Sequence, residues 1–234
     1  MQSNDHPIGR LLTRRETLAA LGGAAILAGV PLRLGAQSLP ACIATPAQME
    51  GPFFTETQLN RSDIRSDPSD KSVKDGVPLT LTLRVSSVTA RGCAPLAGAM
   101  VDLWHCDAAG AYSDSDRGTA GKRFLRGYQV TDGAGAVSFT TIYPGWYPGR
   151  AVHIHFKVRV MAGPALGNEF TSQLYFDDAV SDRVLGLRPY SGRGKRDTRN
   201  SDDSLFRRGG TRLLLALAES RGGYAGEFSV GMMA

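Results

Sequence analysis

The sequence predicts an all-β protein, an antiparallel β-sandwich with long loops. Two observations support this fold class: short stretches alternate apolar with polar residues, and clusters of glycine and proline separate them. Many short strands joined by such turns are typical of sandwiches and barrels. The stretches with the length and two-residue period of a strand are 79–88, 99–106, 126–130, 136–140, 153–160 and 171–176.

Turn residues mark the ends of several of these strands. The triplet Thr-Asp-Gly at 131–133 follows the third stretch, and the triplets Tyr-Pro-Gly at 143–145 and 147–149 follow the fourth. The segment 211–220 has no decisive period and suits a helix or a strand, of which we favour a buried strand. The region from about 79 to 230 is therefore expected to form one sandwich.

Composition argues for one folded domain and against a nucleic-acid partner. Of the 234 residues, 42% are hydrophobic, which is enough for a sizeable core. The net charge is +5, but the basic residues near the C-terminus alternate with acidic ones and lack an aromatic platform. We interpret that region as a solvated loop. Its charged residues include Arg193, Lys195, Arg196, Asp197, Arg199, Asp202, Asp203, Arg207 and Arg208.

The N-terminus predicts export. Arg14 and Arg15 precede an apolar stretch, 18–34, that is rich in glycine and alanine, and this arrangement resembles a twin-arginine signal. The stretch contains Pro31 and falls short of the roughly 20 apolar residues that span a bilayer. We therefore favour a removable signal over a membrane anchor, and we expect a periplasmic or extracellular protein without stable membrane insertion.

These boundaries divide the chain into three parts. We predict an export signal over 1–36, an N-terminal extension over 37–78 and the sandwich domain over 79–234. The sequence contains no internal repeat that would indicate a further domain.

The three cysteines do not form a thiolate zinc pattern, because none lies in a C-x-x-C pair. Cys42 and Cys93 stand in polar, turn-like surroundings, and an oxidising destination favours a disulfide between them. Cys106 ends an apolar run and is expected to face the packed interior. Three free buried thiols are the alternative.

The sequence contains a candidate metal-binding pair, His153 and His155, in an otherwise apolar strand. Alternate side chains of a strand share a face, so both imidazoles point the same way and can chelate a first-row metal. The alternative is a pair of hydrogen-bonded or exposed histidines. Candidates for further ligands are the tyrosines of the loop 143–150, which holds two prolines and two glycines, and Tyr112, which follows another strand. Taken alone, each tyrosine is more often a half-buried packing residue.

Four separated segments of the chain, in the same order, are similar to intradiol ring-cleavage dioxygenases, the family of protocatechuate and catechol dioxygenases. The runs 101–112 (from Val-Asp-Leu-Trp-His-Cys-Asp to the tyrosine) and 144–156 (Pro-Gly-Trp-Tyr-Pro-Gly-Arg-Ala-Val-His-Ile-His-Phe) resemble the iron-binding motifs of this family. Segments 45–54 and 173–176 agree as well. The resemblance covers the chain from about Cys42 onward and is closest to exported, single-chain members.

The resemblance implies a mononuclear, non-haem iron(III) site. By the family pattern its ligands are Tyr112, Tyr147, His153 and His155, with Tyr147 and His155 axial. The chemistry agrees with this assignment, because phenolate is a hard anionic donor suited to a hard trivalent ion. Trp104 and His105 are expected to pack behind the site.

The resemblance also implies the reaction. The enzyme would insert both atoms of dioxygen into a catechol-type diol and cleave its ring between the hydroxylated carbons, which yields a muconate-type diacid. Arg150 would stabilise developing negative charge, Tyr147 would leave the metal and act as a base, and Gln173 would support the pocket. A homo-oligomer is compatible with the sequence.

Two alternatives belong to other classes. The chain could be a secreted β-sandwich binding module in which the histidine pair is incidental, or a metal-free member of the family. Colour separates them from the enzyme, because a ferric phenolate absorbs visible light and a metal-free protein does not.

Overall fold

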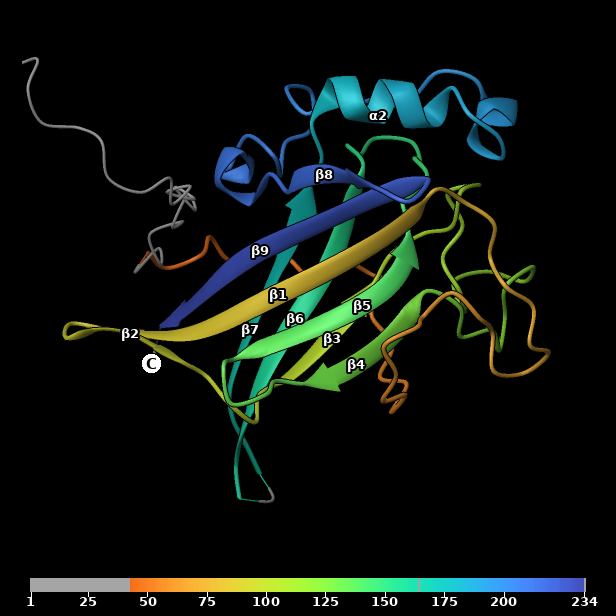
Figure 1. Cartoon of the computed structure of the whole chain (residues 1–234). Coiled ribbons are helices and arrows are strands. Elements are labelled where there is room, and N and C mark those ends of the chain that lie inside the picture. Colours follow the sequence, from red (N-terminus) through yellow and green to blue (C-terminus); the bar gives the residue numbers. More distant parts are fainter. Residues whose placement is uncertain (1–42, 164, 234) are drawn as a thin grey trace, which may run out of the picture. The chain divides into compact units, whose positions relative to one another are not determined.

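The computed structural model describes residues 43–163 and 165–233. They form two β-sheets and confirm the predicted all-β sandwich (Figure 1). The predicted export signal, 1–36, and the first residues of the predicted extension lie outside the described residues. The elements are β1 (Pro78–Thr89), β2 (Gly92–Pro95), β3 (Met100–Trp104), β4 (Arg126–Val130), β5 (Ala136–Ile142), β6 (His153–Ala162), β7 (Ala165–Tyr175), α2 (Asp178–Leu185), η1 (Tyr190–Arg193), η2 (Gly210–Leu213), β8 (Ala216–Ser220) and β9 (Gly223–Met233).

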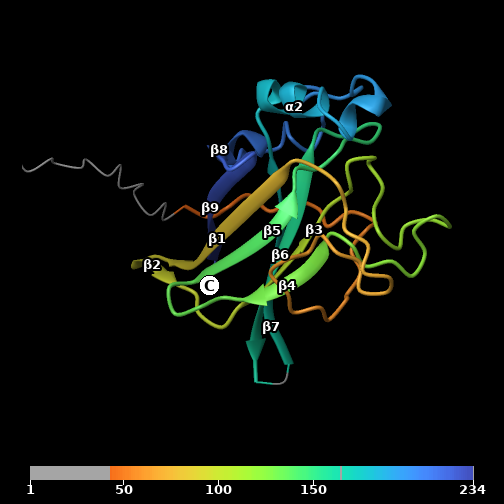
Figure 2. The ribbon, with the colours of Figure 1, turned by 45° about the vertical axis from the view of Figure 1, so that its right-hand side comes forward.

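The first sheet is built around β1. Its order is β2-β1-β9-β8, and β5 pairs with the first half of β1 on the edge that β2 occupies further along. The second sheet has the order β4-β3-β6-β7, and its ladders are all antiparallel. The pairing of β1 with β9 is parallel, which is the one departure from the predicted antiparallel arrangement among the named strand pairs. Figure 2 shows the two sheets as separate layers.

The main core lies between the two sheets. In β1 the buried residues alternate with exposed ones, so that Leu79, Leu81 and Leu83 face the second sheet. On β6 the residues of the opposite parity from the histidines, Ile154 and Phe156, face back into the same core. Burying one such side chain stabilises the fold by about 1.5–3 kcal/mol. The histidines therefore lie on the outer face of the second sheet.

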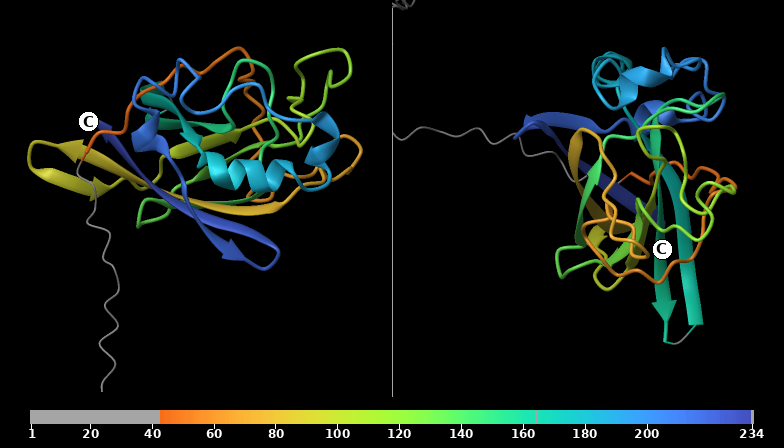
Figure 3. Two further views of the ribbon diagram at one scale, coloured as in Figure 1. Left: turned by 90° about the horizontal axis from the view of Figure 1, so that it is seen from above. Right: turned by 90° about the vertical axis from the view of Figure 1, so that its right-hand side faces the viewer.

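A segment of the N-terminal extension covers that outer face. We call residues 48–56 the strap; it runs along the side of β6 and β7 that faces away from the first sheet (Figure 3). Glu50 of the strap pairs with Lys157, and Glu56 pairs with Arg159 at 2.7 Å. Because the strap covers them, the first six residues of β6 are buried on both faces.

The sequence predicted most strands correctly, but the prediction for the C-terminal region was wrong. Segment 211–220 was expected to be one buried strand; instead η2 occupies its start, and β8 is a largely exposed edge strand. The sequence also did not indicate α2, which Asp177 caps by accepting hydrogen bonds from the backbone of Ala179 and Val180. With eight residues, α2 is too short for its period to be recognised.

The cysteines agree with the prediction as far as the structure describes them. Cys106 is buried and free, and Cys93 is disulfide-bonded. The predicted partner of that bond, Cys42, lies outside the described residues. Over residues 43–163 and 165–233, the structure contains no helix long and apolar enough to cross a membrane.

Candidate metal centre

The register of the second sheet builds the floor of the site. Gln173 of β7 pairs with His155 of β6, His155 pairs with Trp104 of β3, and Trp104 pairs with Arg126 of β4. Paired residues project on the same face of a sheet, so these four side chains form one row across it. In the adjacent row, His153 pairs with Tyr175.

Two loops bring the tyrosines over this floor. After β3 the carboxylate of Asp107 accepts hydrogen bonds from the backbone of Ala109 and Ala111 at 2.9 and 3.0 Å, which turns the chain back toward Tyr112. The loop with Tyr147 touches it, since Gly145 N donates to Asp107 O at 3.1 Å. A Cβ on Gly145 would lie 2.5 Å from that oxygen, so only glycine permits the loops to approach so closely.

The four predicted ligands converge. The Oη of Tyr147 lies 3.0 Å from Nε2 of His153, and the Oη of Tyr112 lies 3.5 Å from the same nitrogen. The Nε2 atoms of His153 and His155 are 3.0 Å apart. The loop with Tyr112, the loop with Tyr147 and β6 thus bring two phenols and two imidazoles to one point, although Tyr112 is 41 positions from His153 in sequence.

The imidazoles are oriented by different means. His153 is held by its Nδ1, which lies 2.6 Å from the carbonyl of Ala151, so that Nε2 faces the other donors. The ring of His155 stacks on Trp104, with centroids 5.0 Å apart and planes inclined by 8°. Its buried Nδ1 has no hydrogen-bond partner among the residues that the structure describes. Stacking therefore takes the place of a hydrogen bond in fixing the ring of His155.

The donor set has the spacing that a bound metal requires. Ligands about 2.1 Å from a common ion and separated by 90–120° lie about 3.0–3.6 Å from one another. The three measured separations, 3.0, 3.0 and 3.5 Å, fall in this range. Within the described part of the chain, no three His, Cys, Asp or Glu side chains form a group that could hold a metal, so tyrosines must complete the set. Two phenols and two imidazoles fit a hard trivalent ion.

Burial sets the charge of these side chains when no cation is bound. Burial, assisted by the charge of Arg150, lowers the pKa of His153 to about 3, and burial lowers the pKa of His155 well below its usual value. Burial likewise raises the pKa of Tyr147 to about 12 and the pKa of Tyr112 well above 10. The imidazoles are thus neutral and ready to ligate, whereas the phenols need a bound cation to ionise near neutral pH.

The other predicted site residues lie at one edge of the donor cluster. Nη1 of Arg150 is 3.4 Å from Nε2 of His153, and Nη2 of Arg150 donates to Oε1 of Gln173 at 2.5 Å. Trp104 and His105 do not contribute donors. The ring nitrogens of His105 contact Cys106 O at 2.8 Å and Thr141 Oγ1 at 2.7 Å, which places this histidine behind the site as expected.

The comparisons with known proteins agree with this geometry. Residues 49–185 match the family model described as Dioxygenase. An intradiol ring-cleavage dioxygenase from Tetranychus urticae has a TM-score of 0.71 and 30% identity, and the match covers 82% of this chain and 95% of that one. This chain belongs to the intradiol ring-cleavage dioxygenase family. The dioxygenase domain of a carbohydrate-binding fusion protein from Streptomyces sp. SirexAA-E is also similar, with a TM-score of 0.61 and 31% identity over 82% of this chain and 99% of that one.

Curated members of the family match over shorter stretches. The protocatechuate 3,4-dioxygenase beta chain of Burkholderia cepacia is 33% identical over 122 residues, which is 47% of this chain and 51% of that protein. Catechol 1,2-dioxygenase 1 of Acinetobacter lwoffii is 28% identical over 161 residues, 57% of this chain and 49% of that protein. The matched region thus spans about half the length of these relatives. Intradiol dioxygenases generally depend on non-haem iron(III).

Several residues of this family member that shape the site were not foreseen from the sequence. Phe53 of the strap stacks on Tyr112, with ring centroids 4.4 Å apart. Asp203 was assigned to a solvated loop, but its side chain is 1% exposed and pairs with Arg150 at 2.9 Å. Arg196 of the same loop is also buried, at 4% exposure, against Asp178. Alternation of charge in sequence cannot distinguish a solvated loop from one whose charges pair with distant residues.

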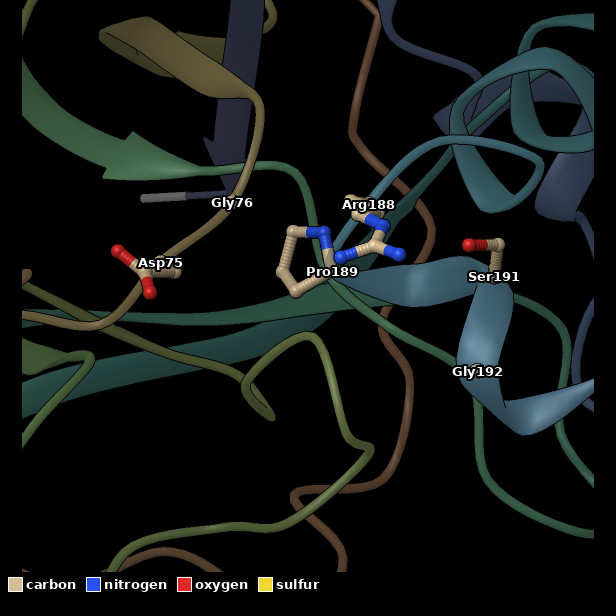
Figure 4. Close-up of a pocket in the computed structure, with 6 residues that line it drawn as sticks. All are labelled: Asp75, Gly76, Arg188, Pro189, Ser191 and Gly192. Carbon is tan, nitrogen blue, oxygen red and sulfur yellow. The ribbon is translucent and has the colours of Figure 1, made fainter.

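The hollow shown in Figure 4 does not include the donor cluster. It has a volume of about 710 Å³ and is lined by Asp75, Gly76, Arg188, Pro189, Ser191 and Gly192. Of the four donor residues, Tyr147 alone is half-buried rather than buried, and it is followed by the exposed Pro148 and Gly149.

Proposed function

We propose that this chain is an iron(III)-dependent intradiol dioxygenase that cleaves a catechol-type substrate. One mononuclear ion would be held by Tyr112, Tyr147, His153 and His155. The convergence of two phenol oxygens and two imidazole nitrogens at separations of 3.0–3.5 Å supports this proposal most strongly. The names of the relatives support the substrate class, because one is a protocatechuate dioxygenase and another a catechol dioxygenase.

A bound metal ion would supply the chemistry that the side chains lack. When bound, iron(III) supplies a Lewis-acidic centre that chelates a catecholate and makes its ring reactive toward dioxygen, so that both oxygen atoms enter a muconate-type diacid. Tyr147 stands at the accessible side of the cluster and is the tyrosine that can give way to a substrate oxygen. The phenolate of Tyr147 would then be a base for a catechol proton, because burial raises the pKa of this side chain when no metal is bound.

Arg150 and Gln173 act at the same edge. The guanidinium of Arg150 points one nitrogen at the donor cluster, where it stabilises negative charge that develops on the substrate. Gln173 accepts a hydrogen bond from Arg150 and donates one to the carbonyl of Met49 at 2.9 Å, so it links Arg150 to the strap. We therefore assign Gln173 a supporting role.

The test is product analysis. Iron-loaded protein is exposed to ¹⁸O-labelled dioxygen with a panel of catechols that includes catechol, protocatechuate and hydroxyquinol, and the products are identified by mass spectrometry. A muconate-type diacid that carries both atoms of labelled dioxygen is the expected product. A colourless protein that retains no iron would favour the metal-free member or the binding module. A coloured, iron-loaded protein that converts none of the panel would contradict the proposed activity.

We also propose that the protein is exported by its twin-arginine sequence. The support is the pair Arg14-Arg15 ahead of the apolar stretch. Replacing both arginines by lysine should retain the protein in the cytoplasm, as fractionation and immunoblotting would show. Undiminished export of the double variant would contradict the proposal.

A further inference from the structure

Asp203 is a buried carboxylate that collects N–H groups from two distant parts of the chain. Its Oδ2 accepts hydrogen bonds from Nε of Arg150 at 2.9 Å and from the backbone of Ala151 at 3.0 Å. Its Oδ1 accepts from the backbone of Leu205 at 2.7 Å and of Phe206 at 3.4 Å. Burial alone would raise the pKa of Asp203, but the charge of Arg150 and the backbone of Ala151 hold that pKa below its usual value. Asp203 is therefore charged, and both of its carboxylate oxygens accept hydrogen bonds. These bonds connect the C-terminal loop that contains Asp203 to the residues just before β6.

Arg150 is held on two of its three nitrogens and presents the third to the site. Nε is bound by Asp203, and Nη2 donates to Gln173 at 2.5 Å and to Oη of Tyr175 at 3.3 Å. Nη1 remains, and it lies 3.4 Å from Nε2 of His153. Because a guanidinium is planar, fixing Nε and Nη2 fixes the direction of Nη1.

The hydrogen bonds around Arg150 close into a ring through the strap. Oη of Tyr175 donates to Oε1 of Gln48 at 2.7 Å, and Nε2 of Gln48 donates to the carbonyl of Leu205 at 2.9 Å. Leu205 in turn donates its backbone N–H to Asp203. Gln48 precedes the stretch that matches the family model, 49–185, and Asp203 follows it. Gln48 and Asp203, which both belong to the ring, thus lie outside the matched stretch.

We propose that Asp203 is a positioning residue that aims Arg150 at the substrate, and that Gln48 closes the ring that holds both. This inference rests on the proposed function, since it assigns Arg150 a role in the reaction. An arginine released at Nε would swing toward solvent, because the side chain of Arg150 is already 18% exposed. Loss of Asp203 should then resemble a partial loss of Arg150.

The first test is Asp203→Asn in the iron-loaded enzyme. Asparagine keeps the size of the side chain but offers one oxygen and one NH2 group to four N–H donors, so one pair of donors loses its acceptor. We expect kcat to fall about tenfold or more, with a smaller change in KM and unchanged iron content, because misaligned groups cost rate more than binding. In the Arg150→Ala background, the same substitution should lower kcat less than about twofold, since coupled residues are not additive.

A second readout is independent of turnover. In protein labelled with ¹⁵N-arginine, the Nε–H of Arg150 should exchange slowly with solvent, with or without metal. Asp203→Asn should accelerate this exchange about tenfold or more, because the buried acceptor is lost. Gln48→Leu breaks the ring of hydrogen bonds but leaves the carboxylate of Asp203 in place. This variant should also accelerate the exchange of the Arg150 Nε–H and lower kcat, with a smaller loss of kcat than Asp203→Asn.

Asp67→Asn is the matched control. Asp67 is also buried, and its two oxygens also collect backbone N–H groups, from Ser69 at 2.9 Å, Arg123 at 2.6 Å and Phe124 at 3.1 Å. Among the residues that the structure describes, Asp67 makes no hydrogen bond with Arg150, so its substitution should lower the melting temperature but leave kcat and the exchange of the Arg150 Nε–H unchanged.

The outcomes separate the inference from the proposed function. Unchanged exchange of the Arg150 Nε–H in Asp203→Asn, or additive losses of kcat in the double variant, would overturn the positioning role. Conversion of no catechol by the wild-type protein would overturn the proposed function, and with it the role of Asp203 in a reaction. The exchange measurement would then still report whether Asp203 holds Arg150.

Discussion

Tyr112 and Tyr147 have the same functional group in two different settings. Tyr112 is 2% exposed, lies under the ring of Phe53 and belongs to a loop that Asp107 fixes by hydrogen bonds. Tyr147 is half-buried, and it precedes two exposed residues in a loop between β5 and β6. A ligand that must stay needs the first setting, and a ligand that must leave needs the second. Under the proposed function, the surroundings of each tyrosine, rather than its residue type, would give it its role.

The largest effect should come from removing one of the two imidazole donors that complete the set with the tyrosines. His155→Ala deletes one of the two buried imidazoles, and we expect affinity for iron to fall more than about 100-fold, which exceeds the usual cost of losing a residue that only orients a ligand. Iron content after dialysis measures this. His105→Gln is the control, because His105 is equally buried but points its nitrogens at Cys106 and Thr141. Equal loss of iron in both variants would argue against the donor assignment.

Arg150→Ala sharpens the comparison by leaving both tyrosines in place. Because Arg150 faces the cluster without being one of its four donors, turnover should fall about 10²–10³-fold, as for other removed donors to a developing anion. Iron content and the visible band of the resting protein should change little. Steady-state kinetics with iron analysis checks this, and parallel losses of iron and activity would instead make Arg150 structural.

A smaller effect concerns the metal-free protein at high pH. Both tyrosines have a pKa above the usual value of 10: burial raises the pKa of Tyr147 to about 12 and the pKa of the more deeply buried Tyr112 well above 10. The stability associated with their neutral forms is present below pH 10 and is lost as the pH rises toward 12. Denaturant unfolding at several pH values should show that Tyr112→Phe removes more of this alkaline loss than Tyr147→Phe. The reverse order would contradict the assigned difference in burial.

The sequence predicted the parts of the site that depend on local pattern. An H-x-H pair in an alternating strand puts His153 and His155 on one face whatever the rest of the chain does. The Pro- and Gly-rich surroundings of Tyr147 likewise predict a constrained loop. The resemblance to the family then predicted that Tyr112 and Arg150 belong to the same site as these residues.

What the sequence did not reveal depends on contacts between distant segments. Phe53, Gln48 and Asp203 reach the site only after the strap and the C-terminal loop fold over the second sheet. Asp203 stands among alternating charges, and nothing local distinguishes it from Asp202, which is exposed. The prediction for segment 211–220 was wrong for a related reason. The sequence of its leucines does not show which of them will be buried once the chain folds.

The most direct test of the unequal tyrosines is anaerobic visible spectroscopy of iron-loaded Tyr112→Phe and Tyr147→Phe, each with and without a catechol. Tyr112→Phe should alter the ferric phenolate band in both states, because that ligand is permanent. Tyr147→Phe should alter the band of the free protein only, since the substrate would already have displaced that phenolate. A catechol complex of Tyr147→Phe that differs from the wild-type complex as strongly as the free proteins differ would contradict the account.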